Sequence, residues 1–382
     1  MRPLLLVLLP LVASCGAPDL QAAFTRFDVQ VTDGSGAVQQ FVALIDQADK
    51  TLDIALPALE DTDLSDAIIA ARDRGVKIRA ITDYDQAGDA GTVALLDAGV
   101  PVTLADDGIT YFDFNIKADV AWTSQQTIMS DAWVIADRKE AVVASEAGSK
   151  QDGTRVTIDI VGEDLLIDLE AEHNQIFGGE DAVSKTAYDD LAKSQTDNRW
   201  AYPTQTDQIM EVWFGPQQRL TKRIIDAVYG ARSSVKVLTD DFANTGLTAA
   251  LESKAREGFD VQVVVGPAFA STSYFESQQL VDATPDVHKH RICGDVEVPT
   301  VVLTDYDPAR NGRQYPSKAF VLTHSLYAAA RLFRGNEVIT DQLIDGSLWV
   351  FDDYDAPSGA MQTLLGTWQD HLDQSTGGLS CP

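Results

Sequence analysis

The sequence predicts an α/β protein made of two similar halves. When the chain is shifted by 183 positions, residues 41–83 align without a gap on residues 224–266 and share one pattern of apolar positions. Each copy also alternates helical and strand patterns, which favours βαβ units. A repeat this long is a duplicated supersecondary unit rather than a solenoid repeat of about 20–50 residues. We therefore expect two halves about a pseudo-two-fold axis, each with a mainly parallel mixed sheet flanked by helices.

Each copy is predicted to contain a helix, a strand, a second helix and a second strand, in that order. Apolar residues recur at helical spacing in the helices and gather in short runs in the strands. Asp61, Thr62 and Asp63 offer capping oxygens to the second helix, and Gly75 can take the left-handed conformation that ends it. The predicted elements are residues 38–48, 51–56, 64–74 and 77–82, with counterparts at residues 220–229, 234–239, 247–257 and 260–265.

Three strings in the first copy resemble the phospholipase D superfamily: ADKTLDIA at residues 48–55, RGVKIR at residues 74–79 and AGVPV at residues 98–102. The resemblance extends over most of residues 38–372. In that family each half contributes a His-x-Lys-x4-Asp motif to one central site. One His attacks phosphorus, the other protonates the leaving group, the Lys pair holds the phosphate oxygens and the Asp supports the His. The resemblance therefore implies a phosphodiester site between two halves.

The first half lacks the His and the Lys of this motif. Within residues 129–137, Ser130 takes the position of the His and Ala132 that of the Lys, whereas Asp137 keeps the Asp. The downstream Ser that binds phosphate in the family corresponds to Ser145. An alanine cannot supply a cation, so we expect no phosphate clamp from this half.

The second half shows the same loss. Val298 takes the position of the His and Thr300 that of the Lys, whereas Asp305 keeps the Asp. The downstream Ser corresponds to Ser325, and residues 336–337 (Asn-Glu) resemble the Asn/Glu pair of the family. The Asn of the family's Gly-Ser-x-Asn pattern is absent from both halves. These substitutions argue against phosphohistidine catalysis, so no catalytic residue is assigned.

A second alignment retains some of the chemistry. His288, His290 and Asp295 stand at the three motif positions, with a His in place of the Lys. Two other interpretations remain open: residues 288–291 form a solvated basic turn, or the His-x-His pair binds zinc, although no third ligand is near in sequence. The other histidines, His173, His324 and His371, are assigned to structural or surface positions.

Clustered aspartates do not indicate a metal in this chain. Asp-Tyr-Asp occurs at residues 83–85, 305–307 and 353–355. None of these sites has the twelve-residue spacing of a calcium loop. Because 58 residues are acidic, such clusters are expected without any ligand. We expect no metal and no cofactor.

The N-terminus predicts export and lipid anchoring. Residues 4–12 form an apolar run that is too short to span a membrane and has the layout of a secretory signal. The string Val-Ala-Ser-Cys that ends at Cys15 resembles the lipobox of bacterial lipoproteins, in which the Cys carries the lipid. Gly16 rather than Asp follows it, which favours the outer membrane in that family. The predicted location is the bacterial cell envelope, with the membrane as a partner through the lipid on Cys15.

Two further observations constrain the partners and the covalent structure. Cys293 and Cys381 are the remaining cysteines, and an even pair in an oxidising envelope favours a disulfide. The net charge of −29 repels polyanions, which makes a nucleic-acid partner unexpected.

The sequence therefore predicts a lipid-anchored envelope protein with a catalytically degenerate phospholipase D-like fold that binds or scaffolds an unknown protein or small molecule. The alternative is a phosphodiesterase or phospholipase D-type hydrolase or transferase with a rebuilt site that uses His288 and His290. A third interpretation is an unrelated α/β protein in which only the repeat is real. The predicted segments are a signal peptide (1–14), a lipidated Cys and tether (15–37), a first half (38–180), a connector (181–208), a second half (209–374) and a tail (375–382).

Overall fold

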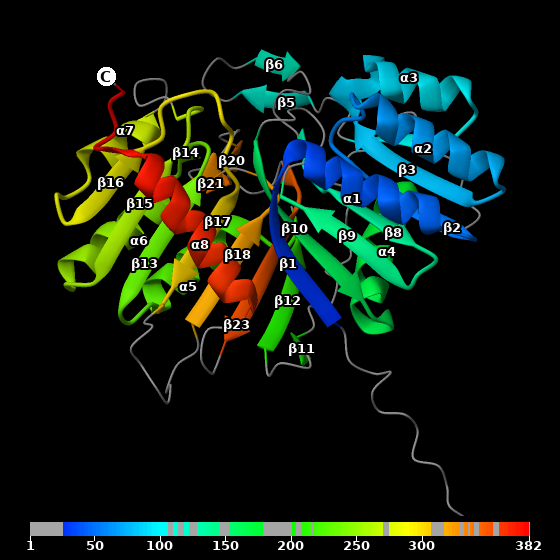
Figure 1. The fold of residues 1–382 in the computed structure, drawn as a ribbon. Coiled ribbons are helices and arrows are strands. Elements are labelled where there is room, and N and C mark those ends of the chain that lie inside the picture. The colour runs from blue at the N-terminus through cyan, green and yellow to red at the C-terminus, as the bar shows by residue number, and fades with distance from the viewer. Residues whose placement is uncertain are drawn as a thin grey trace, which may run out of the picture.

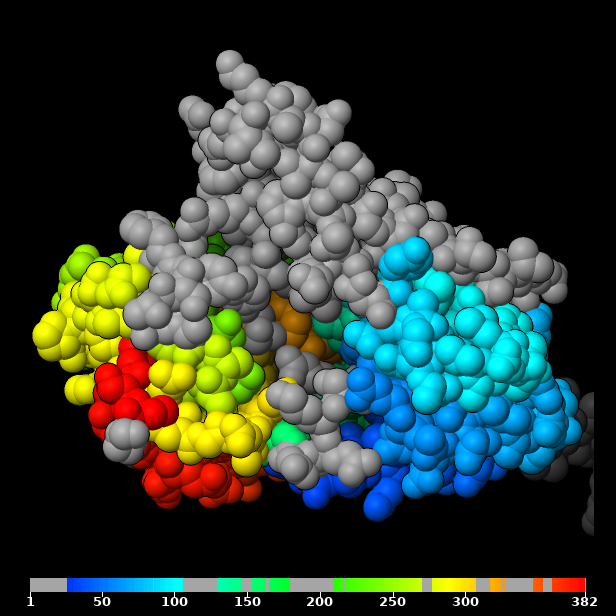
Figure 2. Space-filling view, turned by 90° about the horizontal axis from the view of Figure 1, so that it is seen from above, coloured from blue at the N-terminus to red at the C-terminus, as the bar shows by residue number. Residues whose placement is uncertain are grey.

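The fold consists of two mixed sheets that lie side by side, each flanked by helices (Figure 1). Seen from above, the first half (blue to cyan) and the second half (yellow to red) lie on opposite sides of the molecule (Figure 2). The computed structural model describes residues 26–105, 110–113, 118–121, 128–145, 153–178, 201–203, 208–215, 217–269, 275–306, 317–324, 326–327, 332–334, 337–339, 344–353 and 359–381.

The first sheet has seven strands in the order β1-β10-β9-β8-β2-β3-β4. Parallel pairing is confined to β2, β3 and β4, and the other neighbours pair antiparallel. The sheet is therefore mixed, as predicted, but mainly antiparallel rather than mainly parallel. Parallel pairing is limited to the βαβ units, because the later strands of the half are joined as antiparallel neighbours. The strands are β1 (Arg26–Asp33), β2 (Thr51–Ala55), β3 (Lys77–Asp83), β4 (Val102–Ala105), β8 (Trp133–Ala136), β9 (Glu140–Ala144) and β10 (Thr154–Val161).

The second sheet has nine strands in the order β11-β12-β23-β18-β17-β13-β15-β16-β24. Here too only β13, β15 and β16 are paired parallel. The strands are β11 (Ala201–Pro203), β12 (Gln208–Phe214), β13 (Ser234–Thr239), β15 (Asp260–Val265), β16 (Val287–Arg291), β17 (Thr300–Thr304), β18 (Ser317–Leu322), β23 (Ser347–Asp353) and β24 (Thr376–Gly377).

Helices and short strands complete both halves. The helices are α1 (Gly34–Gln47), α2 (Thr62–Asp73), α3 (Ala90–Asp97) and α4 (Glu163–Phe177) in the first half, and α5 (Leu220–Gly230), α6 (Thr245–Arg256), α7 (Phe275–Asp282) and α8 (Gly359–Gln374) in the second. A 3-10 turn covers Tyr84–Gly88. The short strands are β5 (Thr110–Asp113), β6 (Ala118–Ala121), β7 (Ile128–Met129), β14 (Phe242–Ala243), β19 (Leu326–Tyr327), β20 (Leu332–Arg334), β21 (Glu337–Ile339) and β22 (Ile344–Asp345).

The predicted repeat is reproduced strand by strand. Thr51 pairs with Lys77 in the first sheet, and Ser234 pairs with Asp260 in the second, which is the same register 183 residues later. The capping also repeats: Asp61 and Asn244 accept hydrogen bonds from the first turns of α2 and α6. The glycines after these helices have φ angles of 93° and 84°, which suits glycine at a helix end.

The first half begins earlier than predicted. Arg26–Asp33, assigned above to the tether, is strand β1 and pairs antiparallel with β10 along its whole length. Its sequence RFDVQVTD alternates polar and apolar residues, the pattern of a strand with one buried face. Gly34 then begins α1, so the first half starts at about residue 26 rather than 38.

One apolar core joins the two halves. The cluster that contains Val29 and Trp133 of the first half also contains Val301 and Trp368 of the second. Aromatic rings meet across this boundary: Phe27 contacts Phe351 with ring centroids 5.4 Å apart. Each sheet also has one apolar cluster of its own on its outer face. The cluster of the first sheet lies beneath α1 and α2, and that of the second sheet lies beneath α5 and α6. The shared core makes the two halves a single packed body.

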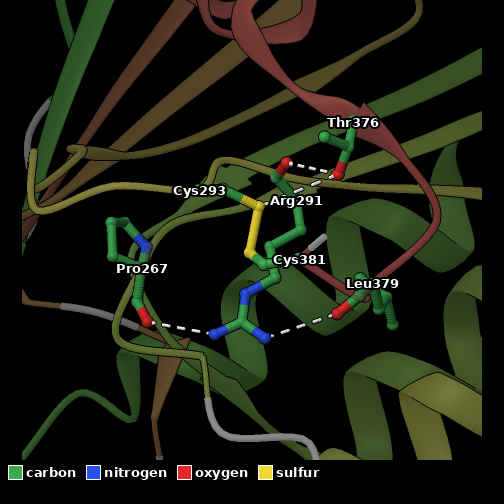
Figure 3. Close-up of a disulfide and its surroundings, with 6 residues drawn as sticks. All are labelled: Pro267, Arg291, Cys293, Thr376, Leu379 and Cys381. Atoms are coloured by element: carbon green, nitrogen blue, oxygen red, sulfur yellow. Dashed lines mark hydrogen bonds between the residues drawn. A yellow bond between two sulfur atoms is a disulfide. The ribbon is translucent and has the colours of Figure 1, made fainter.

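The C-terminal tail adds an edge strand to the second sheet. Thr376 of β24 pairs with Arg291 of β16, and Cys293 is linked to Cys381 by the disulfide that the sequence predicted. The Arg291 guanidinium donates hydrogen bonds to the carbonyl oxygens of Pro267 and Leu379, at 3.2 and 3.4 Å (Figure 3). The tail is therefore part of the folded second half.

Candidate functional site

The motif positions of each half lie at opposite ends of one strand. In the first half β8 runs antiparallel to β2, with Trp133 opposite Ala55 and Ala136 opposite Leu52. Residues 130–132 therefore lie at the carboxyl end of β2, and Asp137 lies at its amino end, roughly 20 Å away by strand rise. The second half repeats this arrangement, since β17 runs antiparallel to β13.

The position of the motif His in the first half lies where the two halves meet. Strand β7 pairs parallel with β22 of the second half, and Ser130 follows directly after β7. A methyl group placed on Gly346 would lie 2.5 Å from Ser130 Oγ, 2.9 Å from Thr323 Oγ1 and 3.0 Å from His324 Cδ2. Side chains from both halves therefore surround Gly346. We call Ser130, Thr323, His324 and Gly346 the seam cluster.

In the second half, the motif His position holds the apolar side chain of Val298, and the motif Lys position holds the buried hydroxyl of Thr300. Thr300 Oγ1 lies 3.1 Å from Thr239 Oγ1, which also donates to the carbonyl oxygen of Asp241 and accepts from the backbone N–H of Leu326. Val298 is part of the shared apolar core. Thr300 is therefore a buried neutral hydroxyl next to Thr239, and it cannot replace the cation of the family motif.

The two retained aspartates hold backbone rather than a catalytic group. Asp137 accepts hydrogen bonds from the backbone N–H groups of Asp49, Lys50 and Thr51, at 2.7–3.1 Å. Burial disfavours its ionised form, but these three donors outweigh that effect and lower the pKa of Asp137. Because Asp137 lies at the far end of β8 from Ser130, it does not support a group at the motif His position, contrary to the implied role.

Asp305 has the same role in the second half. It accepts hydrogen bonds from the backbone N–H groups of Arg232 and Ser233, at 2.6 and 2.9 Å. Arg232 and Ser233 are the residues 183 positions after Asp49 and Lys50. Asp137 and Asp305 both have positive φ angles, of 53° and 60°. The first alignment of the motif therefore identifies structurally equivalent aspartates in the two halves.

The counterpart of Ser145 is Thr323 rather than Ser325. Ser145 follows β9, and its hydroxyl accepts from the backbone N–H of Val156 on β10. Thr323 follows β18, and its hydroxyl accepts from the backbone N–H of Ser347 on β23. Ser325 itself lies outside the described residues, as do Asn336 and the side chain of Glu337.

The second alignment places its residues away from the seam cluster. His288 and His290 lie on β16, the counterpart of β4, next to the tail strand β24 at the edge of the sheet. Burial, with His288 nearby, lowers the pKa of His290. Asp295 is exposed beyond the strand. This alignment assigns the motif to the wrong strand, because β17 and not β16 is the counterpart of β8.

The histidine that does reach the seam was assigned to a structural or surface position by sequence. His324 follows β18, and its position next to Ser130 depends on the meeting of two distant strand ends. No motif spacing signals it. Within the described ranges, no three His, Cys, Asp or Glu side chains converge as metal ligands do.

Acidic side chains surround the carboxyl ends of the central strands in both halves. Asp83 ends β3 and accepts a hydrogen bond from the backbone N–H of Met129 at 2.9 Å. Asp131, which stands between Ser130 and Ala132 in the sequence, is fully buried. In the second half Asp240 and Asp241 follow β13, and burial raises the pKa of Asp241. Such groups repel a phosphodiester anion rather than clamp it.

The described helices include none that is long and apolar enough to cross a bilayer. The predicted signal peptide and Cys15 lie outside the described residues, as does most of the predicted connector.

Comparison with known proteins agrees with the family resemblance. Residues 41–149 match the family model described as cardiolipin synthase, PLD-like domain. No curated protein matches the sequence significantly.

Two solved structures share the fold over most of this chain. The phosphatidylserine synthase of Haemophilus influenzae Rd KW20 is 10% identical with a TM-score of 0.63, and the match covers 92% of this chain and 87% of the synthase. The polyphosphate kinase of Porphyromonas gingivalis is 7% identical with a TM-score of 0.55, and the match covers 91% of this chain and 50% of the kinase. At these identities the likeness concerns the fold and not the chemistry. The chain therefore shares its two-half fold with these proteins, and its residues 41–149 match a phospholipase D-like family model.

Proposed function

We propose that this is a lipid-anchored cell-envelope protein that uses a phospholipase D-like fold to bind or scaffold another molecule without cleaving phosphodiesters. One observation supports this most directly. The four motif positions hold Ser130, Ala132, Val298 and Thr300, and each of these residues is at most 4% exposed. None of them supplies the imidazole nucleophile or the ammonium clamp on which phosphohistidine catalysis depends.

The anchoring part of the proposal rests on the sequence. The apolar run at residues 4–12 and the string that ends at Cys15 match the pattern of a lipoprotein signal. Gly16 favours the outer membrane as the destination. Several acyl chains on one residue would hold the protein durably, since each buried CH₂ contributes about 0.8 kcal/mol.

An assay of phosphodiester turnover tests the absence of catalysis. We expect the purified mature protein to show no turnover of phosphatidylcholine, cardiolipin or bis(p-nitrophenyl) phosphate above buffer. Turnover that is abolished by His288→Ala or His290→Ala would overturn the proposal and favour the second alignment.

A second candidate function is phosphodiester hydrolysis through a rebuilt site at the seam. The observation that favours it is that the imidazole of His324 and the hydroxyl of Ser130 both border Gly346, at the boundary of the halves. This candidate predicts turnover that is lost in His324→Ala and in Ser130→Ala but is kept in His288→Ala. Absence of turnover in the wild-type protein excludes it.

A further inference from the structure

A pocket lies in the first half, away from the seam cluster. It has a volume of about 220 Å³ and is found where β2 and β3 begin. This is the amino end of β2, whereas Ser130 lies at the carboxyl end. The charged side chains that line the pocket are Lys50, Lys77, Arg79 and Arg138, together with Asp53 and Asp137.

The charge balance of this pocket is the reverse of that of the chain. The chain has 58 acidic and 29 basic residues, so acids outnumber bases by two to one. The pocket is lined by four basic and two acidic side chains. Arg138 also pairs with Glu170, so four basic groups face three acidic ones, an excess of one positive charge. A strongly acidic protein repels anions over most of its surface, so a local positive excess creates a selective place for one.

Both carboxylates of the pocket are already engaged by other groups. Asp53 accepts two hydrogen bonds from Arg79, from Nε and from Nη2, each at 2.6 Å. Burial disfavours ionised Asp53, but His173 and Arg79 outweigh this and lower its pKa. Asp137 is occupied by the three backbone N–H donors described above. Both carboxylates are therefore held in fixed positions in the pocket wall.

The second half shows that the fold does not require these cations. It has the same strand register and the same aspartate-to-backbone hydrogen bonds. Nevertheless, each of the four basic positions carries a residue without positive charge. The counterparts of Lys50, Lys77, Arg79 and Arg138 are Ser233, Asp260, Gln262 and Tyr306.

We propose that this pocket binds a small, doubly charged oxyanion of the phosphate class, with Lys50 and Lys77 as its principal ligands. Both lysines are exposed, so their ammonium groups can reach a ligand from solvent. Arg138 lies 3.2 Å from Glu170 with its side chain 42% exposed, and it borders the same pocket. The volume is below the roughly 300–1,000 Å³ of pockets for drug-sized ligands, which favours a compact anionic group. Lysines bind phosphate as point charges through short charge-assisted hydrogen bonds.

Calorimetric titration of the mature protein with inorganic phosphate tests the proposal. At low ionic strength and near neutral pH we expect saturable binding that weakens as salt is added. The double variant Lys50→Ala, Lys77→Ala should bind at least about tenfold more weakly, a loss of about 1.4 kcal/mol. Lys222→Ala is the matched control, because Lys222 is an exposed lysine on α5 of the second half that pairs with Asp226. This control should bind phosphate as the wild type does.

Two further probes distinguish a free phosphate from a lipid headgroup. Glycerol 3-phosphate tests a soluble monoester, and phosphatidylcholine vesicles with and without phosphatidic acid test a headgroup. Loss of binding in the double variant with either probe supports the site. Loss with glycerol 3-phosphate identifies a soluble phosphate as the ligand, and loss with the phosphatidic acid vesicles identifies a lipid headgroup. Equal binding by the wild type and the double variant, or no binding of any probe, would overturn the proposal. Both results are independent of the turnover assay, which concerns the seam cluster.

Discussion

Asp137 and Asp305 show why the Asp of the family motif can persist at positions where the His and the Lys of the motif are replaced. Each caps the backbone loop before the first parallel strand of its half. Loss of this carboxylate would leave two or three backbone N–H groups without their acceptor. The His and Lys positions have no such task in this fold, so they can change to serine, alanine, valine or threonine.

We therefore expect Asp137→Ala to lower the free energy of unfolding by about 1.5–3 kcal/mol, the range for hydrogen bonds to a charged group. Urea unfolding of the purified protein measures this loss. Asp305→Ala should have a similar effect, whereas Asp370→Ala, at an exposed position on α8, should stay within about 0.5 kcal/mol of wild type. A loss below that level for both motif aspartates would contradict their structural role.

His173 makes the stability depend on pH. It is fully buried, its Nε2 lies 3.8 Å from Asp53 Oδ1, and its ring stacks on Phe177. Burial lowers the pKa of His173 from 6.5 to about 4, although Asp53 favours the protonated form. The unfolded chain therefore binds a proton below pH 6.5, and the folded protein binds it only near pH 4. Folding stability should fall by about 3 kcal/mol as the pH drops through this interval.

This pH dependence can be separated from that of the carboxylates. The depressed pKa values of Asp53 and Asp137 add stability that is lost only as the pH falls below 3.8. Burial raises the pKa of Asp89, Asp159, Asp241 and Asp352, so these carboxyls add stability as the pH falls, which opposes the effect of His173. The difference between wild type and His173→Gln in denaturant unfolding at several pH values between 6.5 and 4.5 isolates the histidine, because the carboxyls are common to both proteins. A difference that does not change with pH would show that His173 is not buried in its neutral form.

At the scale of elements, local patterns predicted the repeated units because each contains its own strand, helix and glycine signals. The same patterns could not show which strands pair antiparallel, since that pairing joins distant segments such as β1 and β10. Strand β1 gives only a weak local signal, because its alternation covers eight residues and most of them are polar. His324 was not recognised for a similar reason, as its neighbour Ser130 comes from the other half.

The disulfide is the element-scale feature for which the sequence and the structure agree best. It connects the tail to the segment just after β16, across a sequence separation of 88 residues. Its removal by Cys381→Ser should lower the free energy of unfolding by about 2–4 kcal/mol, because the unfolded chain gains freedom. Wild-type protein under reducing conditions should show the same loss. Two free thiols in the denatured, unreduced mature chain, with Cys15 excluded, would show that the bond does not form.

At the scale of the whole molecule, the proposed lipid anchor on Cys15 is a prediction from the sequence alone. Cys15→Ser should prevent lipidation and release the protein from membranes, or leave it as an unprocessed precursor. Fractionation of cells grown with labelled palmitate measures both outcomes. If the wild-type protein takes up no label, the lipoprotein prediction is wrong.

The shared core predicts that neither half is stable alone. Residues of α8 contact β1, and Trp133 meets Phe214 across the boundary with ring centroids 6.2 Å apart. Arg155 of the first half, only 2% exposed, pairs with Glu297 of the second at 2.8 Å. Residues 26–178 expressed alone would expose this apolar surface and leave Arg155 without its carboxylate. We expect this fragment to aggregate or bind a hydrophobic dye and to lack a cooperative thermal transition, which the full chain should show. A soluble fragment with a cooperative transition near that of the full chain would mean that the halves fold independently and that the core between them contributes little.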